Sequence, residues 1–288
     1  MPPERAKPRS FEVLVTEVVQ ETPDTVTLVL DAPQIPPYRA GQFLTIDPHV
    51  FPVIAGQVAF VEHLKGDKKE LVRAYSMASA PHEPLAITVK EEPYRPGDLH
   101  APLLSPLLVH GIPRGTRFPV VGFTGPYILS PDVEQRTDHI VHLVAGSGVV
   151  PNYAMLKWAL EHEPRVRHTF VYSNKTCDDV IFGRALEQMA VWHKDRLRLV
   201  HCLTREKECP PTMPGAHLGR VDLAVLKDAI PDPNACLVYA CGPELTRWDK
   251  KAAKEKGEEP RPRFLESLRE LLQQLGLPRE RLHQEAYG

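Results

Sequence analysis

Residues 144–151 read VAGSGVVP and join an apolar run to a helix-like pattern. The run ends at Ala145, a Gly-Ser-Gly turn follows, and a helix is expected to begin near Pro151, because proline is tolerated in a first helical turn. Glycines at 146 and 148 let the backbone approach a ligand closely, and the free N–H groups of a new helix favour a pyrophosphate. The last glycine of G-x-G-x-x-G is replaced by proline, so a tight strand-to-helix turn without a ligand is an equal alternative.

The alternation of strand and helix continues through the C-terminal half. Compact apolar runs predict strands at 139–146, 167–174, 197–204 and 236–243. Helical patterns lie between them at 151–163, 178–194 and 221–230. This alternation predicts parallel strands joined by right-handed crossovers, a doubly wound α/β sheet. Ligands of such sheets lie beyond the carboxyl ends of the strands, where the winding direction reverses.

The N-terminal half is predicted to be all-β. Six short runs rich in β-branched or aromatic residues lie at 10–20, 24–33, 40–48, 71–79, 85–92 and 116–123. Turn residues separate them and they partly alternate, which indicates antiparallel strands in a small barrel or a sandwich. We expect an antiparallel six-stranded β-barrel. The polar segment at about 127–138 marks a boundary between two domains, a β-barrel domain at 1–130 and an α/β domain at 138–288.

Composition excludes several classes of function. The formal charge of −2 and the pI of about 6.7 provide no overall field for nucleic acid or an anionic membrane. The five cysteines are scattered and lack C-x-x-C and ferredoxin-type spacings, which argues against disulfides, an iron–sulfur cluster or structural zinc, so no metal site is expected. Without a long apolar run or a signal-like start, we expect a soluble, cytoplasmic protein.

Two features at predicted strand ends concern a nucleotide. Cys241, in YACGP, follows the last apolar strand and would face the ligand crevice, although a buried structural cysteine is the common alternative. Lys175, Arg205 and Arg220 follow strands or lie in their loops, where an adenosine ribose would lie. Such cations could bind a 2′-phosphate, or they could be solvated surface charges.

The run LVRAYSMAS, at 71–79, carries polar side chains that a plain core strand would lack. In a strand, Arg73 and Tyr75 share one face, and Ser76 lies on the other face or at a bend. A guanidinium, a phenol and a hydroxyl in this arrangement can hold a planar, phosphorylated cofactor.

At this point the chain resembles a known family. The R-A-Y-S of residues 73–76 with Ser79 is similar to the flavin-binding R-x-Y-S-x-x-S signature of ferredoxin–NADP(+) reductases and related oxygenase reductase components. AGQF (40–43), LLSPLL (103–108), the glycine loop, CGP (241–243) and the closing HQEAYG agree in family order. The resemblance covers residues 10–248 and the last residues of the chain.

The resemblance implies an FAD site in the barrel. Arg73 would bind the FAD phosphate, Tyr75 would stack on the isoalloxazine, and Ser76 would donate a hydrogen bond near N5. The rest of the flavin would be lined by Thr88, Val89, Lys90 and Ser105. Tyr287 would cover the other flavin face.

The resemblance also implies a dinucleotide site in the α/β domain. The pyrophosphate would be held by Gly146, Ser147, Gly148 and Pro151. Cys241, with Gly242 and Pro243, would lie beside the nicotinamide C4, and Glu285 would help proton and charge balance. Ser76, Cys241 and Glu285 are therefore the expected catalytic residues.

NADP(H) is favoured over NAD(H) as the dinucleotide. Thr204 and Arg205, in LTRE, are similar to the Ser/Thr-Arg-Glu that reads the 2′-phosphate in NADP-using members. Arg220, in LGR, fits a second arginine of bacterial reductases, and Lys175 stands where an arginine is common.

Three segments depart from the family pattern. Residues 47–70 are longer than a minimal hairpin, and the phosphate segment EEPYRPGDLHAPLLS (91–105) lacks a double glycine. After CGP, a further segment holds six Lys/Arg against three Glu between 250 and 263 and leads to an extra helix pattern at 264–277. That segment is either a solvated linker or a docking surface for an acidic partner.

The sequence therefore predicts an FAD-dependent NAD(P)H oxidoreductase that passes electrons to a separate ferredoxin, flavodoxin or oxygenase component. The alternative within the enzyme class is an NADH-dependent reductase component of a multicomponent oxygenase. A flavin-binding interaction protein without turnover is the alternative outside it.

Overall fold

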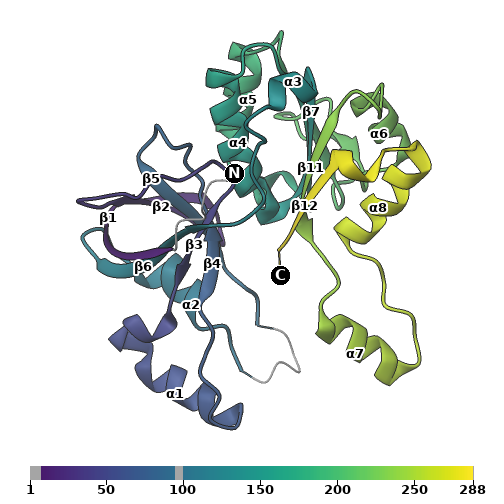
Figure 1. Ribbon diagram of the computed structural model, residues 1–288. Helices are drawn as coiled ribbons and strands as arrows, with labels where there is room; N and C mark the ends of the chain where they lie inside the picture. Colours follow the sequence, from purple (N-terminus) through teal and green to yellow (C-terminus); the bar gives the residue numbers. More distant parts are fainter. Residues whose placement is uncertain (1–7, 95–99, 288) are drawn as a thin grey trace. The chain divides into compact units, whose positions relative to one another are not determined.

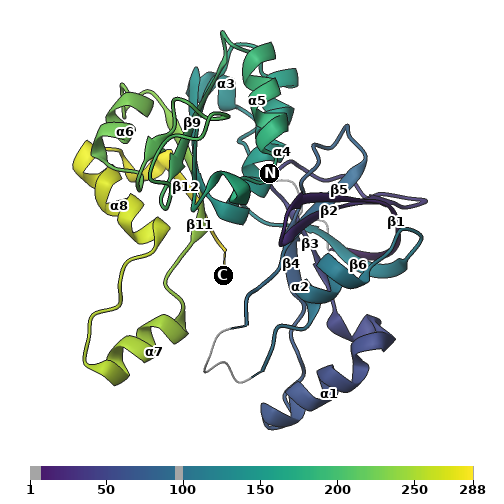
Figure 2. The same cartoon turned by 180° about the vertical axis from the view of Figure 1, so that it is seen from behind.

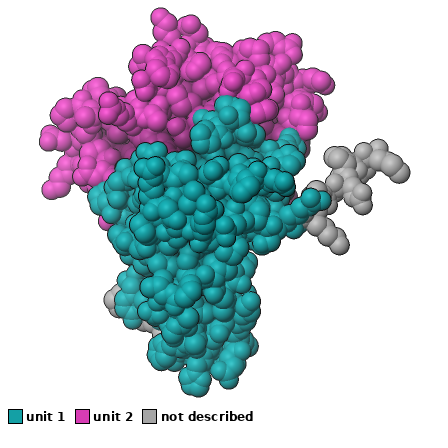
Figure 3. Space-filling view, turned by 90° about the vertical axis from the view of Figure 1, so that its left-hand side faces the viewer, with its two compact units in different colours: residues 1–128 teal, residues 129–288 magenta. Residues whose placement is uncertain are grey.

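A computed structural model describes residues 8–94 and 100–287. The chain divides into two compact units, residues 1–128 and 129–288, which Figure 3 colours teal and magenta. Residues 95–99, part of the segment expected to cradle the FAD pyrophosphate, and Gly288 lie outside the described residues.

The N-terminal unit is a six-stranded antiparallel β-barrel, as predicted (Figure 1). Its strands are β1 (Arg9–Thr22), β2 (Thr25–Asp31), β3 (Phe43–Ile46), β4 (Arg73–Ser76), β5 (Leu85–Lys90) and β6 (Arg117–Thr124). They pair in the order β4-β3-β6-β1-β2-β5. A bridge between Met77 and Ile87 links the two outer strands and closes the barrel.

Alternation along the strands builds the barrel core. Val13 and Val15 of β1 are fully buried, while Glu12 and Glu17 on the same strand are exposed. Period-two alternation places such residues on opposite faces of the sheet. The inward side chains meet in one apolar cluster that includes Leu28, Leu44, Ile46, Ile87 and Phe118.

The segment between β3 and β4 contains a helix that the sequence does not reveal. It holds the 3-10 turns η1 (Pro48–Val50) and η2 (Pro52–Ile54) and the helix α1 (Ala55–Leu64). Ile54, Val58 and Val61 are buried, whereas Val53 and Phe60 are exposed. Because apolar residues lie on both faces, the helix shows no amphipathic period. A second helical segment joins α2 (Leu104–Pro106) to the short π-helix η3 (Leu107–Gly111).

The C-terminal unit is built on a parallel six-stranded sheet, as the doubly wound prediction requires. Its strands are β7 (His139–Ala145), β8 (Arg167–Asn174), β9 (Leu197–Leu203), β10 (His217–Leu218), β11 (Leu237–Pro243) and β12 (Leu282–Tyr287). Their order is β10-β9-β8-β7-β11-β12. The winding direction therefore reverses between β7 and β11.

Helices cover both faces of this sheet (Figure 1, Figure 2). The helices of this unit are α3 (Val133–Arg136), α4 (Val149–His162), α5 (Gly183–Trp192), α6 (Leu223–Ala229), α8 (Phe264–Leu275) and α7 (Arg247–Lys256), the last of which lies apart from the sheet. The 3-10 turns are η4 (Gly146–Gly148), η5 (Cys177–Asp179) and η6 (Arg279–Arg281). Leu226 of α6 and Leu268 of α8 pack with Val141, Val171 and Val238 on one face. Helices α4 and α5 lie on the other face.

The sequence did not predict four elements of this unit, which are α3, β10, β12 and α7. The polar tail forms β12, which pairs in parallel with β11 and becomes the edge of the sheet. The charged stretch after Thr246 forms α7, none of whose residues is buried. Helix α8 coincides with the extra helix pattern at 264–277.

Candidate functional site

In the N-terminal unit, β4 carries the side chains of the expected flavin signature. Arg73 and Tyr75 are half-buried, Ala74 between them is exposed, and Ser76 is buried. Antiparallel pairing with β3 sets Arg73 opposite Ile46 and Ser76 opposite Phe43, so the strand is held on one side along its full length. Arg73 and Tyr75 therefore present a guanidinium and a phenol on one face.

Arg73 is positioned by a buried carboxylate. Its Nη2 donates to Glu70 Oε1 at 2.6 Å and its Nη1 donates to the carbonyl of Leu71 at 2.7 Å. The Glu70 side chain is almost wholly buried and also pairs with Lys65, at 2.5 Å. Burial acts to raise the pKa of Glu70, but the hydrogen bonds from Lys65 and Arg73 outweigh it and lower that pKa.

Tyr75 lies close to the segment that contains Ser105. Burial raises the pKa of Tyr75, and the nearby carboxylate of Glu92 raises it further, so the phenol stays protonated. The Ser105 hydroxyl accepts a hydrogen bond from the Glu92 backbone N–H at 3.0 Å. Arg73, Tyr75 and Ser105 are therefore brought into one region of the barrel unit.

The expected flavin-lining residues of β5 are engaged within the barrel. The Thr88 hydroxyl shares a hydrogen bond of 2.8 Å with the Thr27 hydroxyl. The Val89 side chain is fully buried in the core. Lys90 Nζ donates to Asp24 at 2.7 Å. The place of these three residues along the flavin therefore stays a prediction.

In the C-terminal unit, the glycine turn η4 lies where the winding of the sheet reverses. Gly146 has φ of +53°, a conformation that favours glycine, and a Cβ there would meet no atom within 4 Å. A Cβ on Gly148 would lie 2.3 Å from the Cys241 carbonyl oxygen. The second glycine therefore lets the turn pack directly on the end of β11, and the first leaves open space for a ligand.

Ser147 and Pro151 flank this turn. Ser147 is half-buried in η4, and Pro151 is buried as the third residue of α4, so the helix begins two residues earlier than the sequence predicts. A backbone N–H in the first helical turn has no acceptor within the helix, so the missing N–H of proline costs nothing here.

Strand pairing brings Cys241 beside Glu285. In the register of β11 and β12, Cys241 lies opposite Glu285 and Pro243 lies opposite Tyr287. The Cys241 thiol is fully buried, and its pKa is raised well above the ordinary value by burial and then by the Glu285 carboxylate. Cys241 is therefore a neutral thiol and not a nucleophilic thiolate.

Gly242 completes this cluster. A Cβ on Gly242 would meet the Phe264 ring at 2.6 Å and the Ala145 side chain at 3.2 Å, so glycine is required where α8, β7 and β11 meet. The structure thus brings together the turn at 146–148, residues 241–243 and the tail residues Glu285 and Tyr287.

The basic residues form a second cluster at the carboxyl ends of β8 and β9. The Arg205 N–H donates to the Lys175 carbonyl at 2.8 Å, and the Thr204 N–H donates to the Asn174 carbonyl at 2.9 Å. The Gly219 N–H donates to the Leu203 carbonyl at 2.9 Å, which brings Arg220 to the same edge. Acidic side chains adjoin the cluster as well, since Glu206 accepts from the Cys177 N–H at 3.1 Å.

Asn174 is a residue of this edge that the sequence analysis missed. Its side chain is buried, and neither its amide nitrogen nor its oxygen has a hydrogen-bond partner among the described residues. Buried amides are normally paired, so this one is a candidate for a ligand contact. Its place directly before Lys175, at a predicted strand end, was the available signal.

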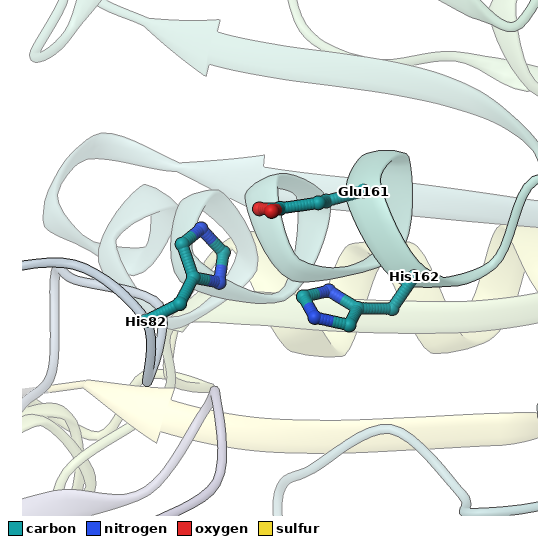
Figure 4. Close-up of side chains that lie close together, drawn as sticks. All are labelled: His82, Glu161 and His162. Atoms are coloured by element: carbon teal, nitrogen blue, oxygen red, sulfur yellow. The ribbon is translucent and has the colours of Figure 1, made fainter.

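Figure 4 shows His82, from the turn between β4 and β5, and Glu161 and His162, from the last turn of α4. His82 belongs to the N-terminal unit and the other two to the C-terminal unit. Within the C-terminal unit these residues offer two ligand atoms, fewer than the three protein ligands of an ordinary zinc centre. The His162 ring instead stacks on Trp158 with ring centroids 3.6 Å apart.

Comparisons with known proteins agree with this arrangement. Residues 143–247 match the model of the oxidoreductase NAD-binding domain. The FAD/NAD-binding domain of a nitric oxide dioxygenase from Vibrio cholerae superposes with a TM-score of 0.71, at 18% identity, over 96% of this chain and 98% of that one. The ferredoxin reductase in carbazole 1,9a-dioxygenase gives 0.70, at 19% identity, over 99% of this chain and 70% of that one.

The chain is similar in sequence and fold to reductases of the ferredoxin reductase-like FAD/NAD-binding family.

Curated members of this family are similar along nearly the whole chain. The ferredoxin reductase component of 3-ketosteroid-9-alpha-monooxygenase from Mycobacterium tuberculosis is 30% identical over 289 residues, 96% of this chain and 65% of the relative. The reductase subunit of glycine betaine monooxygenase from Pseudomonas aeruginosa is 25% identical over 280 residues, 96% of this chain and 64% of the relative. The chain thus spans just under two thirds of the length of these relatives.

None of the helices in residues 8–94 and 100–287 combines the length and the apolar content needed to cross a bilayer.

Proposed function

We propose that this chain is an FAD-dependent NAD(P)H oxidoreductase that passes electrons between a nicotinamide dinucleotide and a separate one-electron carrier. The observation that carries the proposal is the meeting of the open Gly146 turn, Cys241 and Glu285 at the point where the parallel sheet reverses its winding. Dinucleotides bind at this point in doubly wound sheets.

The residues present fit both cofactors. Arg73, with a half-buried guanidinium, and the buried Ser76 and Ser105 hydroxyls form a donor set suited to phosphate and ring acceptors. The space above Gly146 suits a dinucleotide, as does the Asn174 amide, which has no hydrogen-bond partner within the described part of the chain. FAD, when bound, accepts two electrons as a hydride and releases them one at a time.

In this mechanism the chain binds and orients. Arg73 holds a phosphate, and Ser76 donates a hydrogen bond to the flavin ring. Tyr75 presents an aromatic ring whose phenol hydroxyl stays protonated. Cys241 supplies a small neutral side chain against which a nicotinamide can lie, and Glu285 is the nearby carboxylate that balances charge.

For the dinucleotide, we propose NADPH rather than NADH. Lys175, Arg205 and Arg220 gather at the strand ends where an adenosine ribose lies in this type of sheet, and three cations suit a dianionic phosphate. The Glu206 carboxylate at the same edge would repel a bound phosphate and so reduces the preference for NADPH over NADH.

For the acceptor, we propose a ferredoxin, flavodoxin or oxygenase component. Both relatives described above are reductase components of monooxygenases, which favours an oxygenase system. An NADH-dependent oxygenase reductase is therefore the second candidate.

An anaerobic absorbance titration of the purified protein with NADPH and with NADH tests the proposal. We expect a flavin band that bleaches faster with NADPH. Bleaching by NADH alone would favour the second candidate, and the lack of any flavin after reconstitution with FAD would refute the enzymatic function.

Arg205→Ala tests the 2′-phosphate assignment, with Arg198→Ala as its control. Both residues belong to β9 or its end, but Arg198 lies near the amino end and pairs with Asp228. We expect the Michaelis constant for NADPH to rise about tenfold or more in Arg205→Ala, with little change for NADH or in the control. Equal changes for both dinucleotides would remove Arg205 from this role.

A further inference from the structure

We propose that α7 and the segment that returns from it, residues 247–263, form a docking surface for an acidic protein. We identify this protein as the one-electron carrier, a step that rests on the proposed function. The surface itself is argued from the exposure and the charge of the residues that form it.

Packing does not explain why α7 is ordered. None of its ten residues is buried, and Figures 1 and 2 show it set apart from the sheet and helices of its own unit. An isolated helix of this length is only marginally stable in water. The cause must therefore lie in its ends.

Both ends of α7 are fixed by specific contacts. The Thr246 hydroxyl and the Asp249 carboxylate form a capping box, and Gly257 ends the helix in the left-handed conformation. Arg263 Nη2 donates to Asp249 Oδ1 at 2.8 Å and thereby ties the returning segment to the first turn. The chain thus holds this helix in an exposed position.

The cations of α7 lie on one face. At about 100° per residue, Arg247, Lys250, Lys251 and Lys254 fall within an arc of roughly 100°, which we call the α7 basic face. Asp249 lies on the opposite side, where Arg263 contacts it. The α7 basic face therefore points away from the returning segment, and all four of its residues are exposed.

Little of this charge is neutralised within the chain. Lys251 has one exposed ion pair, with Glu255 at 3.7 Å, and such pairs contribute little. Among the described residues, Lys250 and Lys254 form no ion pair. The segment holds seven Lys/Arg against four Asp/Glu, whereas the whole chain holds 35 against 37, so positive charge is concentrated here.

An exposed aromatic residue adjoins the α7 basic face. Trp248 is 63% exposed, and the Arg247 guanidinium lies over its ring at 4.8 Å from the centroid. Tryptophan and arginine are the residues that most often anchor protein interfaces. Rim cations around such an anchor mainly accelerate association with an acidic partner.

The composition of α7 favours a protein over a bilayer. Trp248 is its only large apolar side chain, so it lacks the broad apolar face with which helices insert into membranes. The chain as a whole carries a net charge of −2, which disfavours a polyanion as extended as nucleic acid.

The test uses the full-length, FAD-loaded protein and two double variants of equal charge change. Lys250→Glu with Lys254→Glu reverses the centre of the α7 basic face. Lys194→Glu with Lys227→Glu is the matched control, because both lysines are exposed and belong to the same unit. The acceptors are an acidic [2Fe–2S] ferredoxin, basic cytochrome c and ferricyanide.

We expect the α7 variant to reduce the acidic ferredoxin at least about tenfold more slowly at low ionic strength, and to lose most of its salt dependence. Ferricyanide reduction and the Michaelis constant for NADPH should match the wild type. In the control variant the rate of ferredoxin reduction should fall far less. The α7 variant should reduce cytochrome c at least as fast as the wild type does.

Binding without turnover separates the docking surface from the enzymatic function. The contribution of Trp248 to fluorescence is the signal of the wild type minus the signal of Trp248→Phe. This difference should fall saturably when the acidic ferredoxin is added, and its measurement needs no NADPH. If ferricyanide is not reduced by the wild type, the proposed function fails, while this titration still decides the docking surface.

Several results would overturn the docking surface. If both double variants reduce the ferredoxin equally slowly, the effect comes from the net charge of the protein and not from the α7 basic face. If the rate of ferredoxin reduction is unchanged and the fluorescence does not respond, the acidic ferredoxin does not bind at α7. A raised Michaelis constant for NADPH would reassign the lysines to the dinucleotide. Binding to phosphatidylglycerol vesicles that is lost in the α7 variant would make the partner a membrane.

Discussion

At the scale of single residues, Glu70 is the most consequential side chain that the flavin signature does not contain. It is buried between Lys65 and Arg73 and comes from the segment that is longer than a minimal family hairpin. The guanidinium that we assign to a flavin phosphate is therefore held by a carboxylate from outside the signature. An ion pair of this kind fixes the orientation of the guanidinium and favours the ionised form of the carboxyl group.

We expect Arg73→Ala to weaken FAD binding at least about tenfold, because a charge-assisted phosphate contact is lost. It should also lower the free energy of unfolding by about 1–3 kcal/mol, because the buried Glu70 carboxylate loses one of its two partners. Flavin content after gel filtration and urea unfolding of the apoprotein measure the two effects.

The double variant Arg73→Ala with Glu70→Gln separates them. It should recover most of the stability, because no buried charge is left underpaired, while FAD binding stays weak. Recovery of FAD binding would show that Arg73 acts only on the fold.

Cys241 gives a second prediction at this scale. With Cys241→Ser we expect flavin reduction by NADPH to slow by about tenfold or more while FAD stays bound, because a hydroxyl changes the polarity and shape of the surface against which the ring lies. Stopped-flow absorbance measures the rate. A wild-type rate would make Cys241 a purely structural residue.

At the scale of elements, the contact between the glycine turn and β11 is the tightest feature of the candidate site. Gly148→Ala would place a Cβ at 2.3 Å from a carbonyl oxygen of β11, so the turn must move. We expect a loss of about 1–3 kcal/mol in unfolding free energy and a clear loss of dinucleotide affinity.

Gly56→Ala is the control for this change. It lies in α1, its Cβ would meet nothing within 4 Å, and its φ is not positive, so it should be neutral or slightly stabilising. Unchanged dinucleotide affinity in Gly148→Ala would mean that the turn can shift without cost to the site.

Strands β7 and β8 carry buried histidines under α4. Burial, with His139 nearby, lowers the pKa of His142 to about 3, and burial with the adjacent His142 lowers the pKa of His168 well below its usual value. His142 Nε2 lies 3.2 Å from His168 Nδ1 and its Nδ1 is 3.0 Å from the Asn152 amide nitrogen. Both rings are therefore neutral in the folded protein.

This arrangement predicts a pH dependence of stability. Below about pH 6.5 the unfolded chain binds protons at these histidines and the folded chain does not, so stability falls as pH decreases toward 3. Each histidine should cost on the order of 1 kcal/mol per pH unit in that window. Urea unfolding at pH 7.5 and 5.5 measures the loss, which should shrink in His168→Phe; a pH-independent midpoint would contradict it.

The elements also show what the sequence could and could not reveal. All six barrel strands and four of the parallel strands follow from alternation, apolar runs and turn residues. Helix α1 was missed because its apolar residues lie on both faces and its N-cap, Ile54, has no capping side chain. Strand β12 was missed because every residue from Leu282 to Tyr287 is at most partly buried, so no apolar run marks it.

The candidate site shows the same limit. Local motifs predicted Cys241 and the glycine turn separately, and the structure adds that they touch through Gly148. The pairing of Cys241 with Glu285 joins residues over forty positions apart, and only the strand register establishes it. Glu70 and Asn174 carry no motif, because their importance lies in burial rather than in spacing.

At the scale of the whole molecule, the chain consists of two compact units with separate cores. Chains of this kind often unfold in more than one step. We expect calorimetry of the apoprotein to resolve two transitions. FAD should raise the midpoint temperature of one transition and NADP+ that of the other. Each ligand should add about 2.7 kcal/mol to the unfolding free energy of its unit at a hundredfold excess over the dissociation constant.

One transition shifted equally by both cofactors would contradict this expectation. Arg73→Ala should reduce the shift caused by FAD and leave the shift caused by NADP+ unchanged, and Gly148→Ala should do the reverse. The two variants thus assign each transition to its unit.

The place of Glu285 in β12 also has a consequence for synthesis. The N-terminal unit is complete long before the ribosome reaches residue 285, and at about 5–20 residues per second the C-terminal unit needs on the order of ten seconds more. A chain stopped a few residues earlier would keep the turn at 146–148 and Cys241 but lack the carboxylate beside them. If Glu285 balances charge as we propose, translation errors of this kind would yield protein that has both the glycine turn and the thiol but transfers hydride more slowly.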